Sequence, residues 1–383
     1  MAGIEKYGWV NAARGYAILL VVMIHVPQFL FEATKISLLA NTGNMGVQLF
    51  FVMSSFTLLN SYTKRSREDG ITTKRAFFVR RLFRIAPQYW LAAIFYAALS
   101  ALYSKVPTNY LYLLSNIFFI NGLYLPSIVY FPPGGWSIGV EMAFYLTIPL
   151  LFRLATNVRS AVVLTIVAIV ASNLVNYAEY VYVQQHHELN WVALREYELY
   201  FWFPNQFPVF CFGVVLYYLY MTRTISVRAG YWLLLGSILA FLSLCLVPFS
   251  VEYPWYFFQK EYVYAFVFMT FAAGLYASRS RLLAAELIQR IGLVSFSLYL
   301  NHFFVLMVLK AIEKRYFSWA QIHAPTLVGY LRNDLVLIVY YVLTVFLAYS
   351  LSRVTYRYVE LNGIRLGERL LERLGWTGAP AKA

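Results

Sequence analysis

The sequence has little charge and little cysteine. Charged residues make up 13% of its 383 residues and hydrophobic residues 61%, whereas an ordinary soluble domain carries roughly 25% charged residues. One soluble core of this size cannot enclose so many apolar side chains, and intrinsic disorder requires low hydrophobicity. The 2 cysteines, Cys211 and Cys245, lie in apolar runs and are predicted to be packing thiols, which excludes a disulfide scaffold. The composition therefore indicates a protein that folds in a lipid bilayer.

Motifs for metal and nucleotide binding are missing as well. The sequence has no H-E-x-x-H, no paired cysteine ligands and no glycine-rich nucleotide loop, and His186-His187-Glu188 resembles a metal cluster only weakly. We therefore expect no metal. The net charge of +14 would indicate nucleic acid for a soluble domain, but the basic loops of membrane proteins give the same excess. We expect the bilayer, and no nucleic acid, as a partner.

Apolar runs of about 20 residues, the length that crosses the hydrocarbon, occur ten times. They cover approximately 15–32, 45–62, 86–104, 136–153, 160–177, 204–222, 230–248, 261–278, 291–310 and 333–352. We predict an all-α fold, a polytopic helical bundle with about ten transmembrane helices. The shorter run 110–124 contains Asn116 and Asn121 and is predicted to be a re-entrant or interfacial helix.

The basic residues are distributed unevenly between the connecting segments. With the N-terminus in the cytoplasm, 23 of the 31 Lys and Arg fall on the inner side and 8 on the outer side. This bias predicts cytoplasmic N- and C-termini. The first apolar run ends in Gln28 and Phe29 rather than in small residues, so we expect a helix and not a cleaved signal peptide. Residues 1–360 are predicted to be one integral membrane domain, and 361–383 a cytoplasmic amphipathic tail.

Two histidines and one carboxylate lie inside predicted spans, where ionisable groups are expensive and usually functional. His25 follows Arg14 by eleven residues, which places both on one helix face roughly 16 Å apart. That spacing suits a long substrate whose anionic head binds at Arg14 while His25 serves as a base deeper in the membrane. Alternatively, His25 makes a hydrogen bond to a neighbouring helix. His302 shares a helix stripe with Ser295 and Tyr299 and either binds substrate or joins helices. Glu141 either orients an imidazole or an acceptor hydroxyl, or ties helices together.

The segment 63–84 is strongly basic, with eight Lys and Arg. Topology and anionic lipids explain most of this charge. Arg81 and Arg84, three residues apart, can also clamp phosphates together. Ser54 and Ser55 lack a nucleophile motif and are predicted to be small residues at helix contacts.

Six motifs, taken together and in order, resemble those of membrane-bound acyltransferase family 3. They read NAARGYAILLVVMIHV, MGVQLFFVMSSFTLL, RRLFRIAPQYW, WSIGVEMAFYL, VSFSLYLNHF and VTYRYVELNGIRL, and they span residues 11 to about 368. The resemblance implies a multi-pass enzyme of the bacterial inner membrane. Such an enzyme moves an acyl group, often acetyl, from cytoplasmic acyl-coenzyme A to a hydroxyl of a periplasmic or cell-surface glycan.

The resemblance implies roles for Arg14, His25, Arg81, Arg84 and Glu141, and the residue patterns add the others. The expected catalytic residues are His25, Arg14 and Glu141, and the expected coenzyme-binding residues are Arg81, Arg84 and Arg80. The residues expected to bind substrate or support the site are His302, Ser137, Trp136, Tyr145 and Tyr299. The chain departs from the family pattern at Gln48, Ser55, Ala86 and Asn301, which bears on acyl or acceptor preference. The stretch after Glu360 is too short for the hydrolase-like domain that some members carry, so we expect no attached domain.

These roles combine into one hypothesis and leave two rivals. His25 acts as a general base on the acceptor hydroxyl, or it forms a transient acyl-histidine, and the sequence does not separate the two. A polytopic transporter or flippase of a glycan or lipid-linked intermediate is the main rival, although no internal repeat is evident. A non-catalytic assembly or receptor protein is the second, and it would not need Arg14 and His25 aligned.

Overall fold

The part of the chain that the structure describes is mostly helical, with short turns between the helices. This computed structural model describes residues 7–30, 40–66, 72–103, 109–128, 130–185, 199–222, 225–246, 259–323 and 334–376. No β-strand occurs within these ranges, so the predicted all-α class is confirmed. The chain divides into two compact units, a first unit of Met1–Phe50 with Ser280–Tyr358 and a second unit of Phe51–Arg279 with Val359–Ala383.

The first unit is built around the N-terminal helix. Its elements are α1 (Gly8–Leu30), η1 (Asn41–Met45), the start of α3 (Gly46–Ser66), α12 (Glu286–Leu293), α13 (Ser295–His323), α15 (Asp334–Thr355) and most of the π-helical η7 (Tyr356–Glu360). Helix α1 packs against α12, α13 and α15, and its buried residues include Ala17, Ile18 and Val21. The predicted first span therefore lies in a packed core.

Helices α1 and α12 approach each other backbone to backbone. A Cβ atom at Gly15 would collide with the Ile288 carbonyl group, and one at Gly292 would collide with the Asn11 carbonyl group. Further along α1, the Tyr341 hydroxyl donates to the Leu19 carbonyl oxygen at 3.2 Å. Because close-packed backbones leave little room to shift, these contacts fix α1 along its axis and in rotation.

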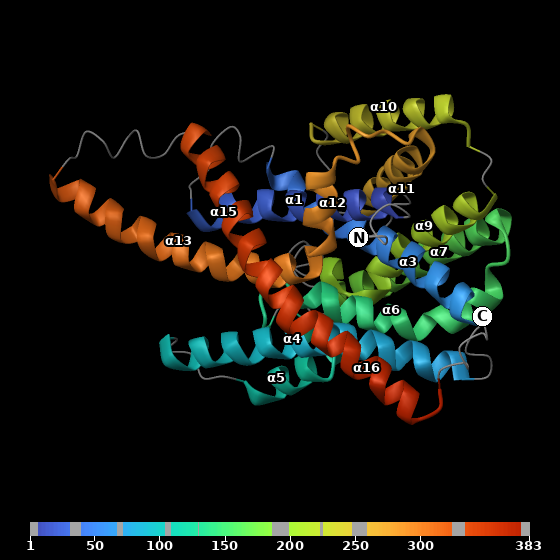
Figure 1. Ribbon diagram of the computed structural model, residues 1–383, viewed down its shortest axis with the longest axis horizontal. Helices are drawn as coiled ribbons and strands as arrows, with labels where there is room; N and C mark the ends of the chain where they lie inside the picture. The colour runs from blue at the N-terminus through green and yellow to red at the C-terminus, as the bar shows by residue number, and fades with distance from the viewer. Residues whose placement is uncertain are drawn as a thin grey trace. The chain divides into compact units, whose positions relative to one another are not determined.

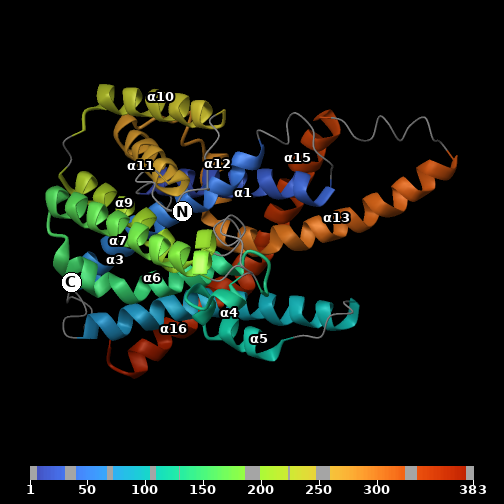
Figure 2. The same cartoon turned by 180° about the vertical axis from the view of Figure 1, so that it is seen from behind.

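The second unit contains the remaining helices. Its elements are α3 from Phe51, α4 (Thr73–Tyr103), α5 (Tyr110–Ile117), η3 (Ile120–Gly122), η4 (Leu125–Ser127), α6 (Gly135–Leu154), α7 (Val158–Gln185), η5 (Leu199–Phe201), α9 (Phe203–Thr222), α10 (Val227–Leu244), α11 (Lys260–Ser278) and α16 (Leu361–Arg373). Helices α7 and α9 lie side by side, as do α10 and α11 (Figures 1 and 2). Hydroxyl and amide groups join them: Ser172 of α7 hydrogen-bonds both Asn205 of α9 and Tyr262 of α11.

Eight helical segments of the described chain are long and apolar enough to cross a membrane. They correspond to eight of the ten predicted spans. The other two predicted spans, 45–62 and 261–278, form the helices α3 and α11. Helix α4 begins at Thr73, well before the predicted residue 86, because Lys and Arg are good helix formers and extend the apolar span into the basic segment.

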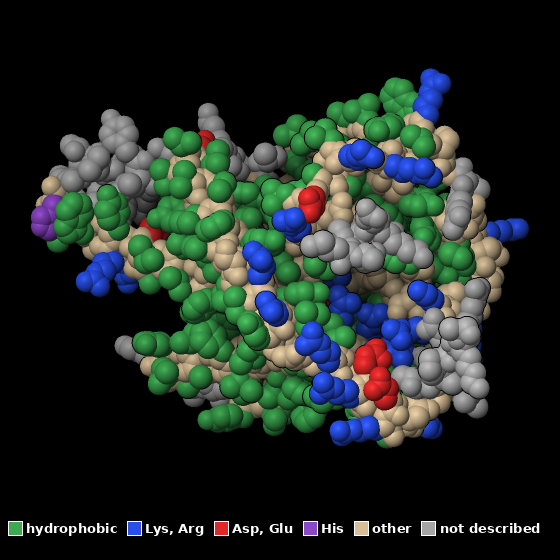
Figure 3. All heavy atoms as spheres, viewed as in Figure 1, with side chains coloured by type: hydrophobic (Ala, Val, Ile, Leu, Met, Phe, Trp, Pro, Cys, Tyr) green, Lys and Arg blue, Asp and Glu red, His purple; other side chains and the backbone are tan. Residues whose placement is uncertain are grey.

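The predicted short helix in 110–124 is confirmed as α5. The side chain of Asn109 caps it by accepting hydrogen bonds from the backbone N–H groups of Leu111 and Tyr112. Its outer face exposes Tyr110, Leu111 and Leu114, and hydrophobic side chains cover α5 and the C-terminal part of α4 on the face shown in Figure 3. Eight residues are too few to cross a bilayer.

The tail forms the predicted amphipathic helix, α16, and its buried face packs on α4 (Figure 1). Gly363 and Gly367 both lie against Phe83 of α4, and Leu371 is fully buried on the same face. The spacing of four residues puts these positions in one row along the helix.

The two cysteines are free, as predicted. Cys211 is buried in α9, and the Cys245 thiol, at the end of α10, donates to the Phe241 carbonyl oxygen at 3.2 Å.

Candidate active site

A pair of imidazoles lies inside the first unit. His25 comes from α1 and His302 from α13, and His25 Nδ1 lies 3.2 Å from His302 Nε2. His302 is fully buried and His25 is partly buried. The ring of Phe303 packs against both imidazoles, with centroid distances of 4.6 Å to His25 and 4.0 Å to His302. A hydrogen bond to a neighbouring helix was one of the two roles predicted for His25, and the structure shows that its partner is a second histidine.

The predicted polar stripe of α13 extends from this pair. Tyr299 is buried, with its ring 5.9 Å from that of His302. Ser295 is fully buried, and its Oγ has no hydrogen-bond partner within the described chain. The neighbouring Asn301 donates to Ser352 and Thr355, which join α13 to α15. The stripe thus faces protein, as expected for polar groups in a bilayer.

Arg14 and His25 lie on one unbroken helix, α1, which runs from Gly8 to Leu30. Ideal helix geometry therefore applies between them and keeps the separation of roughly 16 Å along one face. Arg14 is partly exposed.

Glu141 of α6 belongs to the second unit and has two hydroxyl partners there. The Ser54 hydroxyl of α3 donates to Glu141 Oε1 at 2.5 Å, and the Tyr145 hydroxyl donates to the same oxygen at 2.8 Å. Two donors on one oxygen give strong, charge-assisted hydrogen bonds. Ser54 was predicted to be a small residue at a helix contact, and the structure shows that it also hydrogen-bonds the Glu141 carboxylate.

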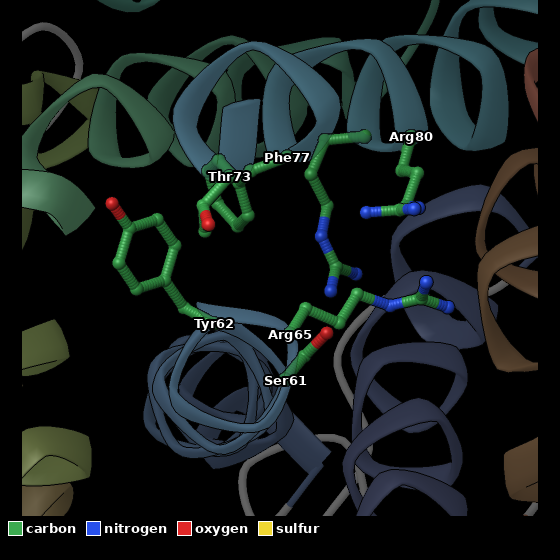
Figure 4. A pocket seen from close by; sticks show the side chains of 7 residues that line it. Ser61, Tyr62, Arg65, Thr73, Phe77 and Arg80 are labelled. Carbon is green, nitrogen blue, oxygen red and sulfur yellow. The ribbon is translucent and has the colours of Figure 1, made fainter. Parts of the chain in front are cut away.

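The basic segment lines a pocket between α3 and α4 in the second unit (Figure 4). The lining residues are Ser61, Tyr62, Arg65, Thr73, Phe77, Arg80 and Arg81. The guanidinium of Arg81 lies over the Phe77 ring at 5.6 Å, and its buried Nε has no hydrogen-bond partner within the described chain. Figure 4 shows Arg65 and Arg80 extending toward the same side of the opening. The pocket offers cations and hydroxyls, the groups that bind phosphate.

The three arginines predicted to bind the coenzyme do not all line this pocket. Arg80 and Arg81 do, whereas Arg84 pairs at 3.7 Å with the buried carboxylate of Glu360. Sequence reasoning did not single out Arg65, Ser61 and Thr73. A helical pattern continued through the basic segment would have placed Thr73, Phe77, Arg80 and Arg81 on one face of α4.

Trp136 and Ser137 lie at the start of α6. The Trp136 ring is buried, at 4.7 Å from Phe201 and 6.0 Å from Phe51. Ser137 donates to the Gly134 carbonyl oxygen at 3.1 Å. Both residues therefore support the packing of the second unit, and aromatic side chains surround the Trp136 ring. His186 and His187 lie outside the described residues, within which no group of three His, Cys, Asp or Glu side chains forms a metal site.

The fold and these clusters define a multi-pass helical membrane protein with buried ionisable groups. A protein-family model described as an acyltransferase domain matches residues 7–353, and the chain belongs to this family, acyltransferase family 3. Among curated proteins, the chain is 27% identical over 216 residues to "Putative acetyltransferase ORF330" of Acidianus two-tailed virus. That alignment covers 55% of this chain and 57% of the relative, so the chain spans little more than half of the relative's length. No solved structure matches the chain.

Proposed function

We propose that this chain is an O-acyltransferase of the bacterial inner membrane. It transfers an acyl group, acetyl in the simplest case, from cytoplasmic acyl-coenzyme A to a hydroxyl of a periplasmic or cell-surface glycan. Membership of the acyltransferase family supports the reaction class. The observation that carries the chemistry is the imidazole pair of His25 and His302, because a neutral histidine has a nitrogen lone pair that can take up a proton.

The basic pocket supports the choice of donor. Coenzyme A carries phosphate groups at its nucleotide end, and the lining residues Arg65, Arg80 and Arg81 supply three guanidinium groups with Ser61 and Thr73 hydroxyls beside them. Arginine pairs with phosphate through parallel hydrogen bonds. The inward bias of basic residues places this pocket on the cytoplasmic side in the predicted topology, where acyl-coenzyme A is present.

In the proposed step, His25 takes the proton of the acceptor hydroxyl as its oxygen attacks the thioester carbonyl carbon. The new carbon–oxygen bond forms the ester, and the carbon–sulfur bond breaks. The proton on His25 then passes to the departing sulfur, which leaves as the free thiol of coenzyme A. An acyl-histidine route uses the same ring nitrogen as a nucleophile, and trapping an acylated His25 by mass spectrometry would identify it.

The test is release of thiol from acetyl-coenzyme A by purified protein in the presence of a glycan acceptor. We expect His25→Ala to abolish acceptor-dependent release, since a general base contributes roughly 10²- to 10⁴-fold. The matched control is Gln28→Ala, an exposed position on the same helix, which should retain release. Thermal unfolding in detergent would confirm that both variants fold.

Near wild-type release by His25→Ala would remove His25 from the mechanism. Glycan translocation by wild-type protein without any acceptor-dependent thiol release would instead favour a transporter or flippase.

A further inference from the structure

His302 is buried deeper than His25 and makes two directed contacts. Its Nδ1 lies 3.2 Å from the Leu298 carbonyl oxygen, one turn earlier on α13, and its Nε2 lies 3.2 Å from His25 Nδ1. Both ring nitrogens of His302 are therefore engaged within the first unit.

The Leu298 carbonyl group fixes which nitrogen of His302 carries the proton. A carbonyl oxygen can only accept, so Nδ1 of His302 must be the N–H group. A neutral imidazole has one N–H and one lone pair, and an imidazolium in a fully buried position would be costly. The lone pair of His302 consequently lies on Nε2, the nitrogen that faces His25.

The same logic then fixes His25. Because His302 Nε2 accepts, His25 Nδ1 must donate, and the lone pair of neutral His25 lies on Nε2. Phe303, packed against both rings, restricts their rotation and so helps to keep this arrangement.

We propose that His302 is the positioning residue of the transfer reaction: it holds His25 in the tautomer whose Nε2 is unprotonated and ready to take the acceptor proton. This role rests on the proposed function of His25. When His25 gains that proton, its Nδ1–H bond to His302 becomes charge-assisted and stronger, so His302 also stabilises the imidazolium. When the proton leaves with the thiol, the pair returns to its starting state.

The first experiment reads the tautomer directly in the full-length protein. The chain has 5 histidines, so ¹⁵N-histidine labelling gives a small set of signals that His25→Ala and His302→Gln assign. We expect a protonated Nδ1 and an unprotonated Nε2 on both His25 and His302, with a scalar coupling between His25 Nδ1 and His302 Nε2. A proton on Nε2 of either residue at rest would overturn the proposal.

The second experiment separates positioning from packing. His302→Phe keeps a ring but has no acceptor, and we expect a fall in kcat of about 10- to 100-fold, less than the roughly 10²- to 10⁴-fold that a general base contributes, because His25 itself remains and still adopts the productive tautomer part of the time. The donor KM should not change. His302→Gln keeps an acceptor oxygen and should retain most of kcat. Met307→Leu, an exposed position on α13, is the matched control.

Equal kcat for His302→Phe and the wild type would overturn the positioning role, and so would equal losses in His302→Phe and His302→Gln. These outcomes are distinct from failure of the proposed function, which His25→Ala tests by itself. The ¹⁵N measurement reads the tautomers in the wild-type protein and needs the two variants only to assign its signals, so it does not depend on the activity of any variant.

Discussion

At the scale of the residue, Glu141 shows how a carboxylate is accommodated inside a membrane helix. The hydroxyls of Ser54 and Tyr145 both donate to Oε1. We propose that Oε2 accepts a hydrogen bond from the substrate. This second oxygen suits the hydroxyl-bearing acceptor that the proposed reaction needs.

The first prediction concerns this second oxygen. Glu141→Gln can still accept from Ser54 and Tyr145 through its amide oxygen, but it loses the charge. We expect the variant to fold and its acceptor KM to rise about tenfold, the equivalent of a lost hydrogen bond to a charged group. Steady-state kinetics at saturating donor measure this change. Ser54→Ala, which keeps the carboxylate, is the comparison, and an unchanged acceptor KM in Glu141→Gln would reduce Glu141 to a tie between helices.

At the scale of the element, α16 competes with the proposed donor. Glu368 of α16 pairs with Arg80 at 3.1 Å and with Arg65 at 3.7 Å, and both arginines line the pocket. Lys and Arg side chains gather around α16 on the face shown in Figure 3. A phosphate entering the pocket must therefore share these guanidinium groups with a carboxylate or displace it.

The second prediction follows from that competition. Glu368→Gln should lower the donor KM by up to about fivefold, because a partly exposed ion pair contributes roughly 0–1 kcal/mol. Arg81→Ala should raise the donor KM more than it lowers kcat. The two shifts are measured in the same thiol-release assay at varied acetyl-coenzyme A. Donor KM values that respond to neither substitution would show that the basic residues serve topology alone.

How much of this site the sequence predicts depends on how far apart the contacting residues are in the chain. Helical spacing was enough to align Arg14 with His25 on α1, since both lie on one element. The contact between His25 and His302 joins α1 to α13 and arises only from packing, so no local pattern could predict it. Ser54 was missed for the same reason, because its partner Glu141 lies on another helix. The early start of α4 was missed because the apolar run begins only after the basic residues, although the helix already includes them.

At the scale of the whole molecule, the family relationship and the helical architecture agree with a multi-pass protein. The distribution of its charges predicts the orientation of the chain. The basic side chains of the α4 start and of α16 belong to the side that the positive-inside rule assigns to the cytoplasm.

The third prediction is that both ends of the chain face the cytoplasm. A fluorescent protein fused after residue 376 should fluoresce, and alkaline phosphatase at the same position should be inactive. Phosphatase fused after residue 185, at the end of α7, should be active, because five of the predicted spans precede this position and the N-terminus is predicted to be cytoplasmic. The reverse pattern at either position would contradict the assigned orientation.

The burial of Cys211 and the hydrogen bond of Cys245 matter for a protein that binds thioesters. An activated thioester acylates an accessible thiolate by simple exchange, which would divert the acyl group into self-modification. Cys211 is shielded inside α9, and the Cys245 thiol is engaged with a carbonyl oxygen of its own helix. The chain thus offers its donor few competing sulfur nucleophiles, and a thiol-reactive dye that follows coenzyme release should meet little background from the protein.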